Sequence, residues 1–278
     1  MAKAIMIQGT ASGVGKTLLT LALCRIFKQD GYTVAPFKAQ NMTTNTYTTP
    51  GGEAIAISQY LQALAAGIPP TPDTNPVILK PSTQKKATEI ILHGKPYDTI
   101  TPYNFTSIKQ QLVPQIMDAY HRLAATHDII VIEGAGSPVE LNLNTDDIVN
   151  MGMATRANAP VLLVADIDRG GVFAALYGTL QLMKPQEQAL VKATVVNRFM
   201  GEVEYFTDGV EIIENITKLP VAGVIPYIDI NLPEEDSVYS GTTLQADFES
   251  QFDLIADNAR HALDMALIYR ILDKGASL

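Results

Sequence analysis

The stretch Gly9–Thr17, which reads GTASGVGKT, decides the fold of this chain. It follows the short apolar run Ala4–Gln8 and precedes Lys16–Gln29, whose apolar residues recur with helical spacing. A glycine-rich turn between a buried strand and a helix can point its backbone N–H groups at a phosphate, where the helix N-terminus favours negative charge. We therefore predict a phosphate-binding loop, or P-loop, that holds ATP.

The individual residues of this loop have distinct expected roles. The backbone N–H groups from Gly13 to Thr17 should surround the β-phosphate, Lys16 should reach the β- and γ-phosphates, and the Thr17 hydroxyl should ligate Mg²⁺. The spacing is one residue longer than the commonest pattern, but the flanking strand and helix favour a true site over an incidental glycine-rich turn. The predicted nucleotide-binding residues of the loop are Thr10, Ser12, Gly13, Val14, Gly15, Lys16, Thr17 and Leu18.

Further short apolar runs, bounded by Gly, Pro or Asp, predict an α/β fold with a doubly wound, mostly parallel sheet. Runs without alternation are typical of strands that are covered on both faces. The predicted strands are Ala4–Gln8, Thr33–Phe37, Ile129–Ile132, Val161–Ala165, Ala193–Val196 and Val221–Ile225. The predicted helices are Lys16–Gln29, Glu53–Ala66, Ser107–Thr126, Asp147–Ala157, Val172–Met183 and Glu202–Thr217. Alternation of the two implies right-handed crossovers.

Four regions follow from this pattern. Residues 1–228 form the P-loop domain, within which 69–103 is a substrate-side insertion rich in Pro, Thr and Lys with one short strand at Glu89–His93. Residues 229–246, with an acidic run and Pro233, read as a linker. Residues 247–278 contain an amphipathic stretch, Phe248–Leu272, which we expect to pack as a helix on the same domain.

Composition excludes several classes of function. The 278 residues carry a net charge of −9, which argues against binding to nucleic acid or to anionic lipid, so any positive potential is local. The single cysteine, Cys24, allows neither an intramolecular disulfide nor a cysteine-based metal cluster, and its place on an apolar helix face predicts a core residue. With no signal peptide or eighteen-residue apolar run in view, we expect a cytoplasmic protein that does not enter membranes.

Segments outside the P-loop indicate which family of P-loop proteins the chain resembles. Polar residues follow several predicted strands, at the edge where open α/β sheets bind ligands. The segments are PFKAQNM at 36–42, NPVILKP at 75–81, IEGAGSP at 132–138, DIVNM at 147–151, VADIDRGGVF at 164–173 and VNRFMG at 196–201. Together they resemble the synthetase domain of the cobyric acid synthase family over about residues 4–238. More distant resemblance, in the P-loop and the Glu-Gly-Ala-Gly segment, is to dethiobiotin synthetase-like P-loop proteins.

The resemblance implies ATP-dependent amidation of corrinoid side-chain carboxylates in cobalamin biosynthesis, taking cobyrinic acid a,c-diamide to cobyric acid through an acyl phosphate. It implies Lys16, Lys38 and Glu133 as catalytic residues and Thr17 and Glu133 as Mg²⁺ ligands, with Glu53 as a third candidate. Asn197 matches the position that contacts adenine. The substrate candidates are Gln40, Asn41, Lys80, Asp166 and Arg169, with Lys85 and Lys86 as further cations for which exposure to solvent is the better interpretation. Lys38 as a solvated lysine and Glu133 as a turn carboxylate remain alternatives.

The chain lacks one part of the family pattern. Cobyric acid synthases continue into a glutaminase domain with a nucleophilic cysteine, whereas Cys24 lies in the first predicted helix. Three explanations stay open: the sequence is a piece of a longer chain, a separate glutaminase subunit joins it, or free ammonia is used. The helical C-terminal stretch favours a natural short chain. The candidate partners are therefore a corrinoid, a glutaminase subunit and a second copy in a homodimer.

Two other functions remain as alternatives. One is a dethiobiotin synthetase-like enzyme that activates a different carboxylate, against which the segments at 40–42 and 166–173 count. The other is a nucleotide-switch ATPase. Such ATPases carry a signature lysine early in the P-loop, where this chain has Thr10, Ala11 and Ser12.

Overall fold

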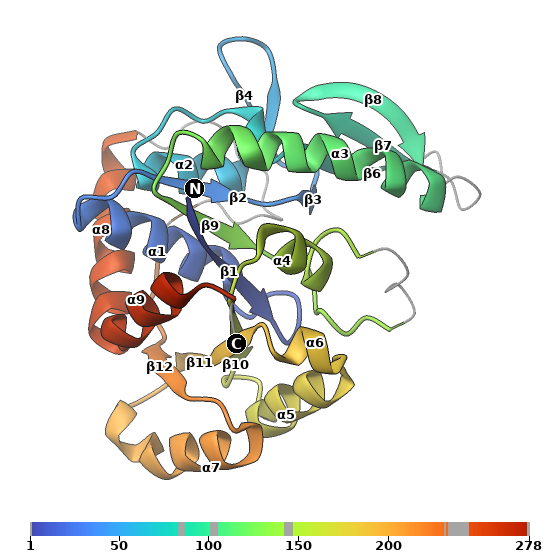
Figure 1. The fold of residues 1–278 in the computed structure, drawn as a ribbon. Helices are drawn as coiled ribbons and strands as arrows, with labels where there is room; N and C mark the ends of the chain where they lie inside the picture. The colour runs from blue at the N-terminus through green and yellow to red at the C-terminus, as the bar shows by residue number, and fades with distance from the viewer. Residues whose placement is uncertain are drawn as a thin grey trace.

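Six apolar runs form one parallel sheet in the computed structural model, which describes residues 2–82, 87–100, 105–141, 147–230, 232 and 245–276. The strands lie in the order β12-β11-β10-β1-β9-β2, so the sheet grows on both sides of β1 (Figure 1). They are β1 (Lys3–Gly9), β2 (Val34–Phe37), β9 (Ile129–Glu133), β10 (Val161–Asp166), β11 (Val191–Phe199) and β12 (Val221–Pro226). The predicted α/β fold with a doubly wound parallel sheet is confirmed.

Helices cover both faces of this sheet. Successive side chains of a strand point to opposite faces, so Ile5 and Ile7 pack into one apolar cluster while Ala4 and Met6 pack into the other. The first cluster includes residues of α1 (Lys16–Gln29), α2 (Ile57–Ala66), α8 (Gln245–Ala262) and α9 (Met265–Lys274). The second includes residues of α3 (Phe105–Ala124), α4 (Met151–Ala157), α5 (Val172–Leu182) and α7 (Thr207–Thr217). The short α6 (Pro185–Gln188) leads into β11.

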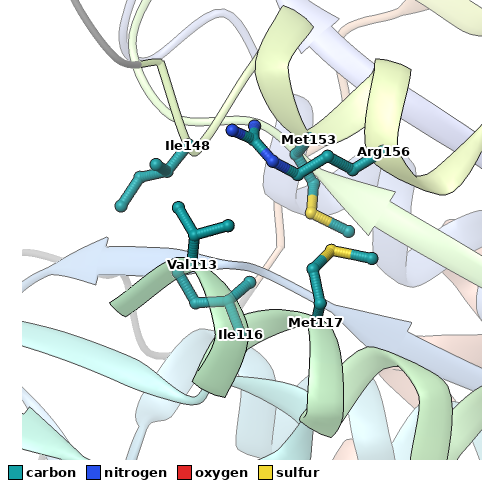
Figure 2. A pocket seen from close by; sticks show the side chains of 6 residues that line it. All are labelled: Val113, Ile116, Met117, Ile148, Met153 and Arg156. Carbon is teal, nitrogen blue, oxygen red and sulfur yellow. The ribbon is translucent and has the colours of Figure 1, made fainter. Parts of the chain in front are cut away.

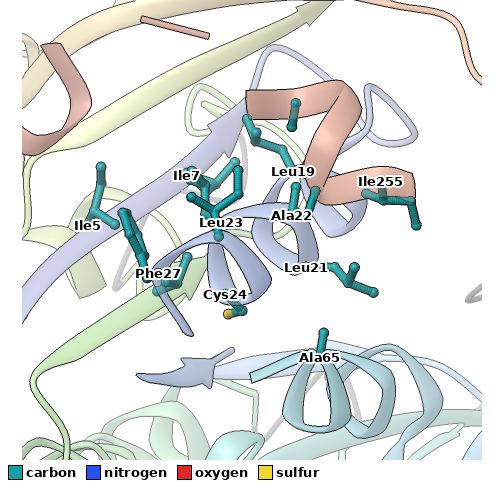
Figure 3. Packing of buried hydrophobic residues seen from close by; sticks show 14 of the residues in the cluster. Ile5, Ile7, Leu19, Leu21, Ala22, Leu23, Cys24, Phe27, Ala65 and Ile255 are labelled. Atoms are coloured by element: carbon teal, nitrogen blue, oxygen red, sulfur yellow. The ribbon is translucent and has the colours of Figure 1, made fainter. Parts of the chain in front are cut away.

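Figure 3 shows the first cluster around α1, where Leu19, Ala22 and Leu23 of the helix lie between the sheet and Ile255 of α8. Cys24 is fully buried in this cluster, and burial raises the pKa of its thiol. The prediction of a core cysteine is confirmed.

The insertion at 69–103 contains more strand than its sequence predicted. It supplies β6 (Val77–Ser82), β7 (Ala87–Leu92) and β8 (Lys95–Ile100), which join β3 (Gln40–Met42) in a second sheet of order β3-β6-β7-β8. Proline usually marks the edge of a sheet or no strand at all. Pro81 lies beyond the short stretch of β6 that pairs with β3, and Pro96 lies in the edge strand β8, so both prolines are tolerated.

Three predicted helices begin later than expected, and α7 does so because a 3-10 turn at Val203–Phe206 precedes it. The residues before α2 form β5 (Ala54–Ala56), which pairs antiparallel with β4 (Thr46–Thr48). Before α4, the Asp147 carboxylate accepts hydrogen bonds from the N–H groups of Val149, Asn150 and Gly152 and so fixes a turn. An aspartate that binds nearby backbone N–H groups competes with helix formation, which explains the later start of α4.

The contact between α3 and α4 anchors the second of these helices. In Figure 2, Val113, Ile116 and Met117 of α3 face Ile148 and Met153 across a small apolar hollow. The hollow has no volume that a water molecule could occupy. It is therefore a packing contact, and it holds the segment before α4 that reaches the site described below.

The C-terminal stretch is two helices rather than one. The break falls at Leu263, which bridges to Gly223 of β12, and at Asp264, whose N–H donates to Ala222 O at 2.8 Å and whose carboxylate caps α9 by accepting from Leu267 N at 2.8 Å. Most of the linker predicted at 229–246 lies outside the described residues. No helix in the described part of the chain is both long and apolar enough to cross a membrane.

Candidate functional site

The loop between β1 and α1 has the backbone shape that its glycines allow. Gly13 and Gly15 have φ angles of 74° and 99°, a region that other residues rarely enter. The Asn197 amide, at the end of β11, donates to Val14 O at 2.8 Å. A Cβ atom on Gly15 would lie 1.9 Å from the Asn197 side-chain nitrogen. Asn197 therefore contacts and supports the loop directly. The sequence had predicted only a contact with adenine for this residue.

Lys16 lies inside the loop with its ammonium near two carbonyls. It is buried, and it donates to Ala11 O at 2.8 Å and Gly136 O at 3.0 Å. The second carbonyl belongs to the segment after β9, which is shaped by Asn150. The Asn150 amide donates to Ala135 O at 2.7 Å and accepts from Ala135 N at 3.1 Å. Asn150 lies within the DIVNM segment, but sequence reasoning gave it no role.

Side chains from α1, from α2 and from the residue after β2 meet at Glu133, the last residue of β9. The Thr17 hydroxyl and the Lys38 ammonium donate to the same carboxylate oxygen, at 2.8 and 2.9 Å. The Gln62 amide, on α2, donates to the other oxygen at 2.6 Å. The structure thus brings together the predicted residues Thr17, Lys38 and Glu133. Gln62 was missed, although a polar residue within the apolar helix of α2 is a signal that could have indicated it.

Glu133 is ionised at neutral pH despite its burial. Loss of hydration alone would raise the pKa of a buried carboxyl. The charge of Lys38 and the hydrogen bonds from Gln62, Lys38 and Thr17 outweigh this, and they hold the pKa of Glu133 below its usual value. The site therefore contains a buried carboxylate paired with a buried ammonium.

The donor set at this point suits Mg²⁺. The Thr17 hydroxyl and the Glu133 carboxylate are oxygen donors, and magnesium commonly binds through one or two carboxylates together with phosphates and water. Within the described ranges, no group of three or more His, Cys, Asp or Glu side chains could hold a metal ion by itself. The donors present therefore fit an ion that is shared with a bound nucleotide.

Glu53, the third candidate ligand, is not brought to this point. It lies in the turn between β4 and β5, where its carboxylate accepts a hydrogen bond from the Thr49 hydroxyl. Pairing of Thr48 with Ala54 fixes this turn, and the N–H of Ala54 bonds to Gly94 O in the neighbouring sheet. The strand at 54–56, which the helical prediction overlooked, thus directs Glu53 away from Thr17 and Glu133.

A cleft of about 610 Å³ opens over the P-loop. Its polar floor includes Ser12, Gly13, Gly15, Lys16, Thr17, Lys38 and Glu133. Its more apolar side is built from α1, the segment after β12 and α8. A cleft with convergent polar groups at one end and an apolar wall at the other suits a ligand that has a charged part and a flat apolar part.

Of the predicted substrate residues, Asn41 alone is among the described residues that line this cleft. Its amide donates to Ser58 Oγ at 3.2 Å and to Gln59 Oε1 at 2.9 Å. Gln40 is half-buried on β3, and Lys80 is half-buried on β6 opposite Glu89. Neither lines the cleft, and Lys85 and Lys86 lie outside the described residues.

The other two predicted substrate residues follow β10. Asp166 is buried and paired with Arg198, whose guanidinium lies 2.9 Å from the carboxylate, while Arg169 is exposed in the loop before α5. Arg198 itself lines the cleft and was not predicted. Arg198 has a φ of 62°, in the left-handed region. At this edge of the sheet Arg198 lines the cleft, whereas Asp166, which the sequence indicated, is paired with it and does not.

Replacing Gln62 with methionine is expected to lower the free energy of unfolding by about 1.5–3 kcal/mol, because one oxygen of a buried carboxylate loses its charge-assisted hydrogen bond. Urea denaturation at neutral pH measures this loss. Gln59→Met is the matched control, since Gln59 is buried in the same helix and bonds to Asn41 and Ser58 rather than to Glu133. An equal or larger loss in the control would contradict the role of Gln62.

Comparison with known proteins identifies relatives of this chain. The CobQ/CobB/MinD/ParA nucleotide binding domain model matches residues 5–237. The chain is similar to the cobyric acid synthase of Yersinia enterocolitica, with 51% identity over 95% of this chain and 49% of that protein. It is also similar to that of Photorhabdus laumondii, with 50% identity over 88% of this chain and 49% of the relative. It thus spans about half the length of the curated relatives it matches.

Among solved structures, the MinC:MinD cell division protein complex of Aquifex aeolicus aligns with 18% identity and a TM-score of 0.43, over 94% of this chain and 95% of that one. The matched domain model covers the central sheet from Ile5 onward, together with the P-loop. The chain belongs to the CobQ/CobB/MinD/ParA nucleotide-binding domain family.

Proposed function

We propose that this chain catalyses the ATP-dependent amidation of a corrinoid carboxylate, the synthetase half-reaction of a cobyric acid synthase. The observation that carries the proposal is the convergence of Thr17 and Lys38 on one oxygen of Glu133, beside Lys16 in the P-loop. About 50% identity to cobyric acid synthases over most of the chain supports the substrate class.

The proposed chemistry has two steps. A substrate carboxylate oxygen attacks the γ-phosphorus of ATP, ADP leaves, and an acyl phosphate forms. Ammonia then attacks the acyl carbon and phosphate leaves with one of the original carboxylate oxygens, so a carboxamide remains. Transfer of this kind depends on positioning and on neutralising charge, and no protein nucleophile is needed.

The residues of this chain supply those two requirements. In the proposal, Lys16 and the P-loop N–H groups hold the β- and γ-phosphates, and Lys38 provides a second cation on the substrate side. A magnesium ion held by Thr17 and Glu133 would neutralise charge on the phosphate oxygens. Glu133 therefore has two tasks: to orient Lys38 and to provide an oxygen for the metal.

Two alternatives make different predictions. A dethiobiotin synthetase-like enzyme would use a small carbamate in place of a corrinoid, and a nucleotide-switch ATPase would need no organic substrate. The absence of lysine at Thr10, Ala11 and Ser12 counts against the switch.

An oxygen-transfer experiment tests the proposal directly. The purified chain is incubated with ATP, Mg²⁺, ammonium and a cobyrinic acid a,c-diamide labelled with ¹⁸O in its carboxylates. We expect ADP, phosphate and amide to form in equal amounts, with one ¹⁸O atom in each phosphate released. Mass spectrometry of the phosphate and the corrinoid measures both.

Two controls make this outcome specific. The Lys16→Ala variant should form neither amide nor labelled phosphate, and diaminopelargonic acid should not replace the corrinoid. Phosphate released without ¹⁸O, or at the same rate without the corrinoid, would reject the acyl phosphate mechanism.

A further inference from the structure

The C-terminal helix α8 forms part of the wall of the cleft. Ile255, Asn258 and Ala259 of α8 line it together with Leu18 and Ala22 of α1. In Figure 3, Ile255 lies next to Leu19 and Ala22, which shows the two helices in contact on this side of the sheet. This helix follows the 5–237 segment matched by the nucleotide-binding domain model, so that model assigns it no role.

Asn258 is the polar residue that α8 contributes to this wall. Its side-chain oxygen is buried and has no hydrogen-bond partner in the structure as described. Ile225 of β12 and Ile228 and Ile230 after it line the cleft with hydrocarbon, and Tyr227 and Asp229 of the same segment line it as well. Buried amide groups nearly always have a partner, and one that lacks it calls for an explanation. A ligand that brings a donor into the cleft would supply that partner.

The position of this wall relative to the P-loop indicates which part of a ligand it meets. Thr17 lies at the phosphate end, and Ala22 lies five residues further along α1, which corresponds to about 7.5 Å along the helix axis. The wall therefore lies within reach of a nucleoside attached to phosphates in the loop. Its isoleucines suit the apolar face of a base, and the Asn258 amide suits a polar group on its edge or on the ribose.

We propose that Asn258 binds the nucleoside part of ATP by accepting a hydrogen bond, which makes α8 a functional part of the nucleotide site. The donor is either the exocyclic amine of the base or a ribose hydroxyl. The proposal rests on nucleotide binding by this chain and does not depend on the corrinoid or on amidation.

Ion pairs between α8 and the α1 region hold the helix that carries Asn258 in place. Arg25 of α1 is buried and lies 2.8 Å from both Glu249 and Asp253. Arg260 pairs with Asp30 at 2.9 Å. These contacts fix α8 against α1 on both sides of Asn258. A side chain on a helix fixed in this way loses little further freedom when it binds a ligand, which favours affinity.

Calorimetric titration of the full chain with ATP and with inorganic tripolyphosphate, both with Mg²⁺, tests the proposal. Asn258→Leu should weaken ATP binding roughly tenfold and leave tripolyphosphate binding unchanged, since a single hydrogen bond at the nucleoside end is lost. Asn258→Ala should give the same pattern without added bulk. Asn215→Leu, on the exposed surface of α7, is the matched control and should bind both ligands like the unmodified chain.

Two nucleotide analogues identify the donor. Inosine triphosphate lacks the exocyclic amine, and 2′-deoxy-ATP lacks a ribose hydroxyl. The analogue that has lost the donor should bind the unmodified chain about as weakly as ATP binds Asn258→Leu, and should show no further loss in the variant.

The possible failures are distinguishable. Equal loss of ATP and tripolyphosphate binding in both Asn258 variants, or no loss of either, would overturn the role of Asn258 while the nucleotide site stands. Tripolyphosphate binding to the unmodified chain as tightly as ATP would overturn it too. A failed amidation assay with normal ATP binding would reject the proposed function alone.

Discussion

Replacing Lys16 with alanine is expected to weaken ATP binding by at least about 100-fold, because the variant loses charge-assisted hydrogen bonds to two phosphate groups. In the structure the Lys16 ammonium is already in the loop, held by Ala11 O and Gly136 O. Even without a nucleotide, the side chain is thus already in the place where it would meet the phosphate oxygens. Calorimetry with ATP and Mg²⁺ measures the loss.

The fold of this variant should persist. Lys16 itself and Gly136, one of the two residues whose carbonyl loses its donor, line the cleft, so water can replace the ammonium there. Lys28→Ala provides the comparison, since Lys28 lies in the last turn of the same helix and does not line the cleft. ATP affinity that is the same in Lys16→Ala and Lys28→Ala would refute the assignment of the loop.

Replacing Lys38 with methionine is expected to cost about 3–5 kcal/mol of folding free energy at neutral pH, because it leaves the charge of Glu133 buried without its counter-ion. The carboxylate would keep its bonds from Thr17 and Gln62, but no cation would remain in contact with it in the described structure. This is the largest loss of stability that we expect from a single change at the site.

The pH dependence of this loss has a definite sign. In the unmodified chain the folded-state pKa of Glu133 is below its ordinary value of 4.5, so its contribution is present above 4.5 and is lost as pH falls through the lowered value. In Lys38→Met, burial dominates and raises the folded-state pKa above the unfolded one. The penalty should therefore be small near about pH 4 and grow as pH rises toward about pH 7.

Urea denaturation across this pH range measures the effect. The double variant Lys38→Met with Glu133→Gln removes the charge altogether and should regain most of the stability at neutral pH. A penalty in Lys38→Met that is independent of pH, or one that the second substitution does not relieve, would show that Glu133 is not the buried anion.

The main part of the site could be predicted from sequence because it follows from strand ends. Thr17, Lys38 and Glu133 come shortly after or at the ends of β1, β2 and β9, and the carboxyl ends of parallel strands meet at one edge. Gln62 and Asn258 are different. They reach the site from helices whose distance from it is set by side-chain packing between layers, which periodicity alone does not determine.

Competition between local sequence pattern and strand pairing explains why some helices and strands were predicted incorrectly. Residues 53–56 have the apolar spacing of a helix, but pairing with β4 makes 54–56 a strand and carries Glu53 away from Thr17 and Glu133. Proline is unfavourable within a sheet, but Pro81 and Pro96 lie at edge positions of β6 and β8, where it is tolerated. Asp166 and Arg198 were read separately, and the ion pair between them depends on strand register, since β10 and β11 pair at Asp166 and Asn197.

The bond between Asn197 and Val14 joins positions 183 residues apart in the chain. The P-loop motif is complete within the first seventeen residues, yet this brace exists only after β10 and β11 have been added beside β1. A nascent or partly folded chain would carry the motif without the brace. Nucleotide that binds the braced loop more tightly shifts the equilibrium toward the fully assembled sheet. Binding of a nucleotide to the N-terminal loop thereby stabilises the folded state of the strands β10 and β11, which lie in the later part of the sequence.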